Sequence, residues 1–218
     1  MRFKLACFDL DGTLLNTLGG LTKSLNAARR MNNLGPQTED QVKTFINNGV
    51  VKMITRSLAS DPGDYTEELK ESLLKDYIAY YNSHYLEETM PYNGIVELLT
   101  RLKSDGVLIA CVTNKDDEPS QKLIEHFFPG IFDYVSGSKE GVERKPSSEP
   151  VDICLDALNI AKNEAVYIGD SDTDILTARN SGLELICCAW GYRERGFLLE
   201  SGAVNICSEP LDIRNFMR

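Results

Sequence analysis

The chain has 218 residues, of which 42% are hydrophobic and 26% are charged, a composition typical of a folded protein and not of a disordered one. Its 33 acidic residues outnumber its 23 basic ones and leave a formal charge of −10. This balance argues against nucleic-acid and anionic-membrane partners, which need a basic surface, and the length favours a core domain with an insert.

The N-terminal region begins with a short apolar run, Leu5–Phe8, that stops at Asp9. The run is too short for a membrane span, and its composition is not that of a signal peptide. A continuous apolar run of this length is typical of a strand that is buried on both faces of a parallel sheet. We therefore predict a first strand that ends in the sequence Asp9-Leu10-Asp11-Gly12-Thr13.

The segment from about Asn16 to Glu88 shows helical spacing and no convincing strand. Helices are predicted over residues 18–28, 38–46, 50–59 and 64–84, with Thr38 and Gln41 as a capping box. Because this segment follows the first strand and precedes the others, we predict a helical cap of residues 16–88 inserted into a core of residues 1–15 and 89–218. We interpret the cap as a lid, and its polar turn, Asn47-Asn48-Gly49, as a substrate-contacting loop.

After the insert, short apolar runs alternate with helical patterns. The runs cover residues 107–112, 134–136, 165–168, 185–189 and 204–207, and two of the helices cover residues 94–105 and 172–181. Strands that alternate with helices indicate βαβ units. The sequence therefore predicts an α/β fold with a parallel sheet and helices on both of its faces.

Cysteine and histidine usage gives no sign of disulfides or zinc. The six cysteines form no CxxC pair and lie mostly in apolar runs: Cys7, Cys111, Cys154, Cys187, Cys188 and Cys207. We predict buried, reduced thiols in a cytoplasmic protein. His84 and His126 lie in predicted helices and are interpreted as structural.

Chemically reactive side chains gather where the predicted strands end, which is the edge of a parallel sheet at which ligands bind. They comprise Asp9 and Asp11 after the first strand, Thr113 and Asn114 after the second, and Asp170, Ser171 and Asp174 after the fourth, and Lys145 lies between the third and fourth strands. Each has a structural interpretation by itself, as a helix cap, a helix-dipole partner or a solvated lysine. Because these side chains are expected together at one edge of the sheet, they favour a ligand-binding site there.

Mg²⁺ prefers oxygen ligands and leaves coordination positions open for a phosphate. Asp9, the backbone carbonyl of Asp11 and Asp170 are the predicted ligands. Lys145 would offset phosphoryl charge, and Thr113 and Asn114 would donate to phosphoryl oxygens.

These motifs resemble those of the haloacid dehalogenase-like hydrolase superfamily. Its motifs are matched in order by Asp9-Leu10-Asp11-Gly12-Thr13-Leu14, by Thr113, by Lys145-Pro146 and by Gly169-Asp170-Ser171-Asp172-Thr173-Asp174. Within the superfamily the chain is most similar to the phosphoglycolate phosphatase branch, through Pro91-Tyr92-Asn93-Gly94, Val112-Thr113-Asn114-Lys115 and Trp190-Gly191-Tyr192. The resemblance implies a Rossmann-like core, a strand order of 5-4-1-2-3 and a mobile helical cap.

The resemblance also implies a reaction. Asp9 would be the nucleophile and form an aspartyl-phosphate, and Asp11 would be the acid and base. Asp174, beside Ser171, would orient Lys145 or a water on the metal. The implied function is a Mg²⁺-dependent phosphatase that acts on a small phosphorylated metabolite, phosphoglycolate-like or a sugar phosphate, as a monomer or homodimer.

Three alternatives use the same residues. A phosphoryl transfer of the beta-phosphoglucomutase type needs both Asp9 and Asp11, so the motifs leave it open. A phosphate-binding protein without activity would not need the second aspartate, and a phosphonatase would need a cap lysine, for which Lys23, Lys43 and Lys52 are undistinguished candidates. Departures from the family pattern at Asn16, Asp116-Asp117 and Ser147-Ser148-Glu149 weaken any transfer of glycolate specificity.

Overall fold

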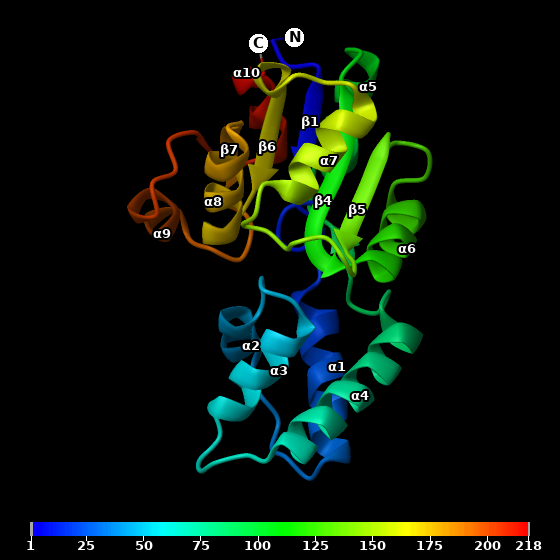
Figure 1. Ribbon diagram of the computed structural model, residues 1–218, viewed down its shortest axis with the longest axis vertical. Coiled ribbons are helices and arrows are strands. Elements are labelled where there is room, and N and C mark those ends of the chain that lie inside the picture. The colour runs from blue at the N-terminus through cyan, green and yellow to red at the C-terminus, as the bar shows by residue number, and fades with distance from the viewer. Residues whose placement is uncertain (1, 218) are drawn as a thin grey trace. The chain divides into compact units, whose positions relative to one another are not determined.

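The computed structural model describes residues 2–217, and its chain divides into two compact units. The core unit comprises the chain up to Asn16 and again from Pro91 onward, and the inserted unit is Thr17–Met90 (Figure 1). The short strands β2 (Leu15–Asn16) and β3 (Met90–Pro91), where the chain passes from one unit to the other, form a two-stranded sheet.

The core unit is built on a parallel sheet in the order β5-β4-β1-β6-β7-β8. Its strands are β1 (Leu5–Phe8), β4 (Leu108–Asp116), β5 (Tyr134–Ser138), β6 (Ala165–Gly169), β7 (Glu184–Cys188) and β8 (Ile206–Cys207). Counted along the chain without the short β2 and β3, β1, β4, β5, β6 and β7 are the first to the fifth strands. Their order from β7 to β5 is then 5-4-1-2-3, so the predicted order is confirmed for these five strands. The sixth, β8, extends the sheet beyond that order, because its two residues pair with the free edge of β7.

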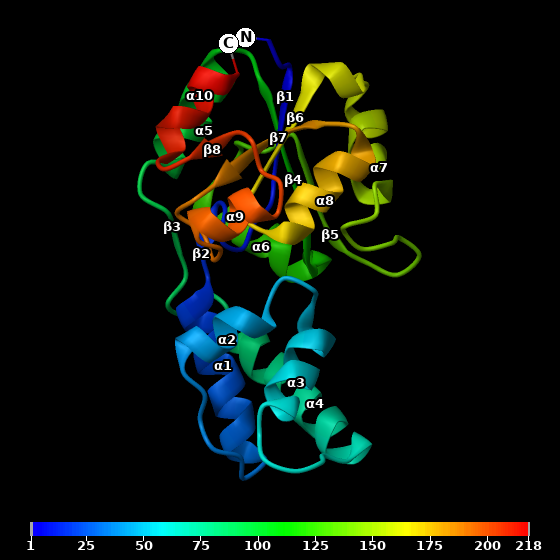
Figure 2. The same cartoon turned by 90° about the vertical axis from the view of Figure 1, so that its left-hand side faces the viewer.

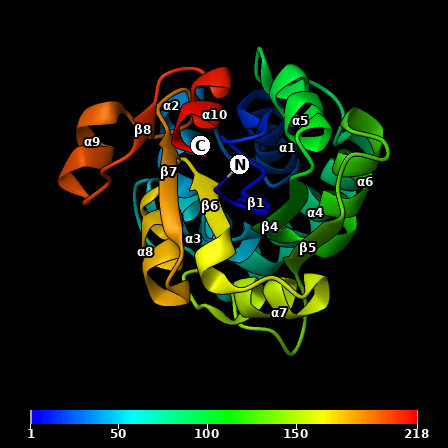
Figure 3. The same ribbon diagram turned by 90° about the horizontal axis from the view of Figure 1, so that it is seen from above.

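Helices cover both faces of this sheet. They are α5 (Ile95–Ser104), α6 (Asp117–Phe127), α7 (Glu149–Leu158), α8 (Asp172–Ser181), α9 (Arg195–Glu200) and α10 (Ile213–Phe216), with short 3₁₀ turns at Lys162–Glu164 and Pro210–Asp212. Figures 2 and 3 show α7 and α8 on one face and α5 and α10 on the other. Alternate strand side chains such as Leu5 and Cys7 pack against Cys154 of α7 and Ala178 of α8. The predicted α/β class is therefore confirmed.

Strand β4 is longer than the predicted run of residues 107–112. Its register with β5 shifts between Val112 and Asp116, and Asp116 pairs again with Ser138. Thr113 and Asn114 therefore lie within the strand and not after it, because an irregular stretch at the sheet edge lets the chain remain extended through polar residues.

The inserted unit is helical, as predicted, and residues 17–88, all of which the structure describes, contain no strand. Its helices are α1 (Leu18–Met31), α2 (Glu39–Phe45), α3 (Val50–Ala59) and α4 (Glu67–His84). The capping box of Thr38 and Gln41 is present at the start of α2. Helix α4 begins three residues later than the predicted residue 64, because the Thr66 side chain caps it by accepting a hydrogen bond from the Leu69 backbone.

The predicted burial of the cysteines is confirmed, since all six are buried. Among the described residues, none of the helices combines the length and the apolar character that crossing a membrane requires.

Candidate active site

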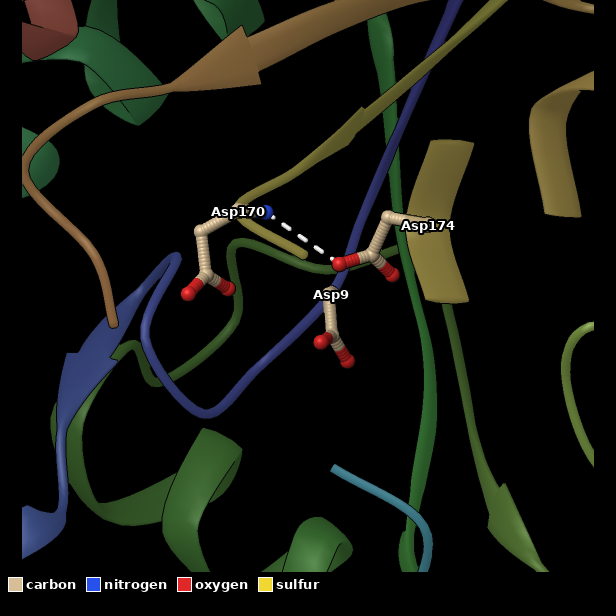
Figure 4. Close-up of side chains that lie close together, drawn as sticks. All are labelled: Asp9, Asp170 and Asp174. Carbon is tan, nitrogen blue, oxygen red and sulfur yellow. Dashed lines mark hydrogen bonds between the residues drawn. The ribbon is translucent and has the colours of Figure 1, made fainter. Parts of the chain in front are cut away.

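The site lies at the carboxyl ends of adjacent strands of the core unit. Parallel pairing of β1 with β6 sets Phe8 beside Ile168, and the Asp9 backbone N–H donates to the Ile168 carbonyl at 2.9 Å. Asp9 and Asp170 therefore emerge at the same edge. One carboxylate oxygen from each of Asp9, Asp170 and Asp174 lies within 4.8 Å of the other two (Figure 4).

Asp174 is held in place by the first turn of α8. Its Oδ2 accepts hydrogen bonds from the backbone N–H of Asp170 at 3.2 Å, from the backbone N–H of Ser171 at 3.0 Å and from the Ser171 hydroxyl at 2.6 Å. The Ser171 hydroxyl in turn caps the helix. Because Oδ2 is engaged three times, Asp174 has one carboxylate oxygen left for the rest of the site.

Lys145 joins two of the carboxylates. Its Nζ lies 2.9 Å from Asp9 Oδ1, 2.8 Å from Asp174 Oδ1 and 2.8 Å from the Tyr167 hydroxyl. The Tyr167 hydroxyl donates its own proton to the Val112 carbonyl at 2.9 Å, so that an oxygen lone pair faces the ammonium. The ammonium donates hydrogen bonds to Asp174 and Tyr167 and forms an ion pair with Asp9.

Burial dominates the electrostatics of the site. It raises the pKa of Asp9 to about 6, with Lys145 acting against the rise and Asp174 adding to it. Burial also raises the pKa of Asp170 well above its usual range, helped by the charges of Asp174 and Asp9. For Lys145 burial would lower the pKa, but Asp174 and Asp9 together outweigh it and raise that pKa. One lysine does not neutralise three carboxylates, so this group of side chains favours an additional cation.

A hard divalent cation such as Mg²⁺ fits this donor set. The buried Asp9 Oδ1, although close to Lys145, accepts no hydrogen bond of good geometry. Asp170 is fixed by the Thr13 hydroxyl at 3.0 Å and by the Tyr192 backbone N–H at 2.7 Å. Carboxylate oxygens that are oriented in this way are the ligands that Mg²⁺ prefers.

Asp11 does not belong to this carboxylate group. Both of its carboxylate oxygens accept hydrogen bonds from Lys115 Nζ, at 3.2 and 3.1 Å. The predicted metal contact of Asp11 therefore rests on its backbone carbonyl alone. The sequence analysis named Lys115 only as part of a family motif and gave it no role. Its position directly after Thr113 and Asn114, the two predicted phosphate-binding residues, was the signal that could have placed Lys115 at the site.

The remaining core-unit residues predicted from sequence also lie at this edge. Hydrogen bonding from Thr113 contributes to lowering the pKa of Asp9, against the larger effect of burial. The Asn114 side-chain amide donates to the Lys145 backbone carbonyl at 2.9 Å and so steadies the loop that carries this lysine. Sequence reasoning missed this role of Asn114 and missed Tyr167, whose hydroxyl is hidden in an otherwise apolar strand.

The predicted cap-loop residues, Asn48 and Gly49, lie in the inserted unit between α2 and α3. The Arg56 guanidinium donates to Asn48 Oδ1 at 2.7 Å and to the Phe45 carbonyl at 2.8 Å, which fixes the loop. Gly49 has a φ of +84°, a backbone conformation that favours glycine. The role of this loop toward a substrate stays a prediction.

Comparison with known proteins identifies relatives of the whole chain. Residues 6–188 match the family described as haloacid dehalogenase-like hydrolase. A phosphoglycolate phosphatase of Rhodospirillum rubrum is 31% identical over 195 residues, which cover 87% of this chain and 80% of that protein. A phosphoglycolate phosphatase of Thiobacillus denitrificans is 34% identical over 202 residues, which cover 88% and 86% respectively. A crystal structure from Lactobacillus delbrueckii subsp. bulgaricus, provisionally named a phosphoglycolate phosphatase, has a TM-score of 0.95 and 35% identity, and the match covers 100% of this chain and 99% of that one.

Proposed function

The chain belongs to the haloacid dehalogenase-like hydrolases, and from this membership we propose that it is a Mg²⁺-dependent phosphatase that cleaves a small phosphorylated metabolite through an aspartyl-phosphate. The observation that carries the proposal is the meeting of Asp9, Asp170 and Asp174 within 4.8 Å, with Lys145 between two of them. The names of the curated relatives support phosphoglycolate or a similar compound as substrate.

Asp9 would be the nucleophile. Its carboxylate oxygen forms a bond to phosphorus while the bond from phosphorus to the ester oxygen breaks. Asp11 gives its proton to the departing alkoxide, then accepts a proton from the water that attacks the aspartyl-phosphate and releases inorganic phosphate. Using one carboxyl as acid and then as base returns the enzyme to its starting state.

The neighbouring residues would bind and neutralise the phosphoryl group. Lys145 faces the nucleophile, so it can exchange one of its partners for a phosphoryl oxygen and offset negative charge there. Thr113 and Asn114 would donate hydrogen bonds to phosphoryl oxygens. Bound by Asp9, the Asp11 carbonyl and Asp170, Mg²⁺ would supply positive charge that keeps Asp9 ionised and orients the phosphate.

Hydrolysis is favoured over the mutase alternative. Both reactions need Asp9 and Asp11, but the curated relatives named above are phosphatases. In our proposal the loop of Asn48 and Gly49 contacts the substrate and residues 16–88 act as the cap. We further propose that the enzyme is cytoplasmic, because its six unbridged thiols suit a reducing compartment. We also propose that it is a monomer or a homodimer.

The test is turnover by purified protein with Mg²⁺, p-nitrophenyl phosphate and a panel of phosphorylated metabolites. We expect phosphate release, its loss on chelation, and a loss of about 1000-fold or more in Asp9→Asn. Intact-mass analysis of rapidly quenched wild type should detect a phosphorylated enzyme that Asp9→Asn does not form. Absence of turnover across the whole panel, with wild type and Asp9→Asn indistinguishable, would overturn the proposal, and isomerisation of a sugar phosphate without phosphate release would favour the mutase.

A further inference from the structure

The segment that follows β7 lies against the site, and the reaction described above does not use it. It carries Trp190, Gly191 and Tyr192, which the sequence analysis named only for a family resemblance. A Cβ at Gly191 would come within 2.4 Å of the Gly12 carbonyl oxygen. The backbone of this segment therefore packs directly against the turn that follows β1.

Trp190 makes a side-chain contact with the same turn. Its indole N–H donates to the Thr13 carbonyl at 3.0 Å, across 177 positions of sequence. An indole has this one donor and no acceptor, and Trp190 is the single tryptophan of the chain. Thr13 lies two residues after Asp11, whose backbone carbonyl is a predicted Mg²⁺ ligand. The indole therefore helps to fix the turn from which that ligand comes.

Thr13 also connects Trp190 to Asp170. The Thr13 hydroxyl donates to Asp170 Oδ1 at 3.0 Å, and the Tyr192 backbone N–H donates to Asp170 Oδ2 at 2.7 Å. The contacts form a closed ring that runs from Trp190 through Thr13 and Asp170 to Tyr192 and back along the chain. Each Asp170 oxygen that accepts one of these bonds has a second lone pair for a cation. Thr13 and Asp170 are fully buried, so bulk water does not replace a bond lost from this ring.

We propose that Trp190 is a positioning residue of the metal site, and that its indole N–H acts through Thr13 to hold Asp170 and the Asp11 carbonyl in the arrangement that binds Mg²⁺. Groups that orient metal ligands contribute about 10- to 100-fold to metal affinity. Because such coupling is reciprocal, bound Mg²⁺ strengthens the indole contact in turn, and the fluorescence of Trp190 reports the metal. This inference rests on the proposed function, which supplies Mg²⁺ as the ion.

The experiment measures Mg²⁺ affinity by calorimetry without substrate, and compares wild type with Trp190→Phe, Thr13→Val and the double variant. Trp190→Phe removes the indole N–H but keeps an aromatic ring, and Thr13→Val removes the hydroxyl but keeps the shape of the side chain. We expect each single variant to bind Mg²⁺ about tenfold more weakly. The loss in the double variant should be smaller than the product of the two single losses, because both substitutions break the same ring.

Phe197→Leu is the control for loss of an aromatic group from the region after β7. Phe197 lies in α9 and is 42% exposed, so its replacement should leave Mg²⁺ affinity at the wild-type value. Thermal unfolding in EDTA measures what each substitution does to folding without the metal. A lower thermal midpoint of Trp190→Phe in EDTA, together with unchanged Mg²⁺ affinity, would mean that the indole serves folding alone and would overturn the inference.

Two further outcomes would also contradict the inference: single losses that multiply fully in the double variant, and a loss in Phe197→Leu equal to that in Trp190→Phe. Wild-type fluorescence supplies a second measurement in case a variant does not fold. Emission from Trp190 should change with added MgCl₂ and saturate at the calorimetric dissociation constant, and unchanged emission in a protein that binds Mg²⁺ would count against the coupling. If wild type itself binds no Mg²⁺, the proposed Mg²⁺ dependence fails and the inference fails with it.

Discussion

Glycines at the site allow carboxylates to pack against backbone. A Cβ at Gly12 would come within 2.4 Å of Asp170 Oδ2, and one at Gly191 within 2.3 Å of the Asp170 Cβ. A Cβ at Gly169 would come within 2.3 Å of the Asp174 side chain. These contacts are shorter than real Cβ atoms show, so glycine is required there by the carboxylates and not by the turn alone.

Gly12→Ala should therefore weaken Mg²⁺ binding. Gly12 has a φ of +85°, so alanine adds backbone strain to the clash with Asp170. We expect the Mg²⁺ concentration for half-maximal activity to rise about tenfold or more, as titration of turnover with MgCl₂ would measure. Gly106→Ala is the control, because Gly106 has a φ of +77° with nothing near its Cβ position. An equal effect in both variants would mean that strain and not the clash is responsible.

Tyr167 should be a positioning residue for Lys145. Its hydroxyl is the only uncharged partner of the three that hold the ammonium, and it is fixed by the Val112 carbonyl. We expect Tyr167→Phe to lower kcat about tenfold while KM changes less, because the oriented lysine matters most when charge develops on the phosphoryl group. Tyr134→Phe in β5 is the matched loss of a hydroxyl in the same sheet. Unchanged kcat in a Tyr167→Phe variant with a normal thermal midpoint would contradict this role.

At the scale of elements, α8 links local sequence to chemistry. Its predicted bounds, Asp172–Ser181, are confirmed, and the helix ends at Gly182, which has a left-handed backbone conformation. The capping box that begins the helix is formed by Ser171 and Asp174, so the contact that starts the helix also orients the carboxylate that holds Lys145. The hydrogen bonds that start α8 therefore also fix one of the carboxylates of the site.

The inserted unit depends on a buried arginine. Arg29 of α1 is 1% exposed, and its guanidinium donates to the Gly35 carbonyl at 2.6 Å, to the Ser57 hydroxyl at 2.9 Å and to Asp61 at 2.7 and 3.0 Å. These bonds connect α1 to the loop before α2 and to the end of α3. They are specified by contacts distant in sequence, and helical periodicity did not reveal them.

Arg29→Met should destabilise the inserted unit by about 3 kcal/mol, because it leaves buried acceptors without donors and Asp61 without its partner. We expect an earlier unfolding transition for α1 to α4, measured by hydrogen exchange of residues 17–90. Arg30→Met is the control, since Arg30 is the exposed neighbour on the same helix. Similar exchange in the two variants would show that the buried network contributes little.

At the scale of the whole molecule, stability should depend on Mg²⁺ and on pH together. Burial raises the pKa of Asp9 to about 6, and a carboxyl whose pKa is raised on folding favours the folded state while it is protonated. This contribution is complete below the unfolded pKa of about 4 and is lost as the pH rises through about 6. Asp170 acts in the same direction.

Because Mg²⁺ binds the ionised carboxylates, it should stabilise the protein more at about pH 7.5 than at about pH 5. At about 100 times its dissociation constant it would add about 2.7 kcal/mol, and each kcal/mol corresponds to about 2–4 °C at this chain length. Thermal unfolding with MgCl₂ or with EDTA at both pH values measures the effect. Asp170→Asn should lose most of the Mg²⁺ increment, and an increment that is independent of pH in wild type would contradict the linkage.

Local sequence alone determined most of the architecture. Continuous apolar runs predicted strands buried on both faces, and helical spacing with caps predicted α2, α3 and α8, because strand and helix periodicity depend only on neighbours along the chain. Short polar motifs at the strand ends predicted the candidate side chains Asp9 and Asp170, since parallel strands bring their carboxyl ends to one edge, and Lys145 was predicted from the loop between the third and fourth strands.

Only the tertiary structure decided which of these side chains meet. The pairing of Asp11 with Lys115, the third contact of Lys145 with Tyr167 and the extension of β4 through Asn114 join residues up to about a hundred positions apart or depend on strand register. Burial, and with it the raised pKa of Asp9, also belongs to the folded chain. The physical reason is that desolvation and ion pairing depend on what surrounds a group in space, and a linear pattern does not contain that information.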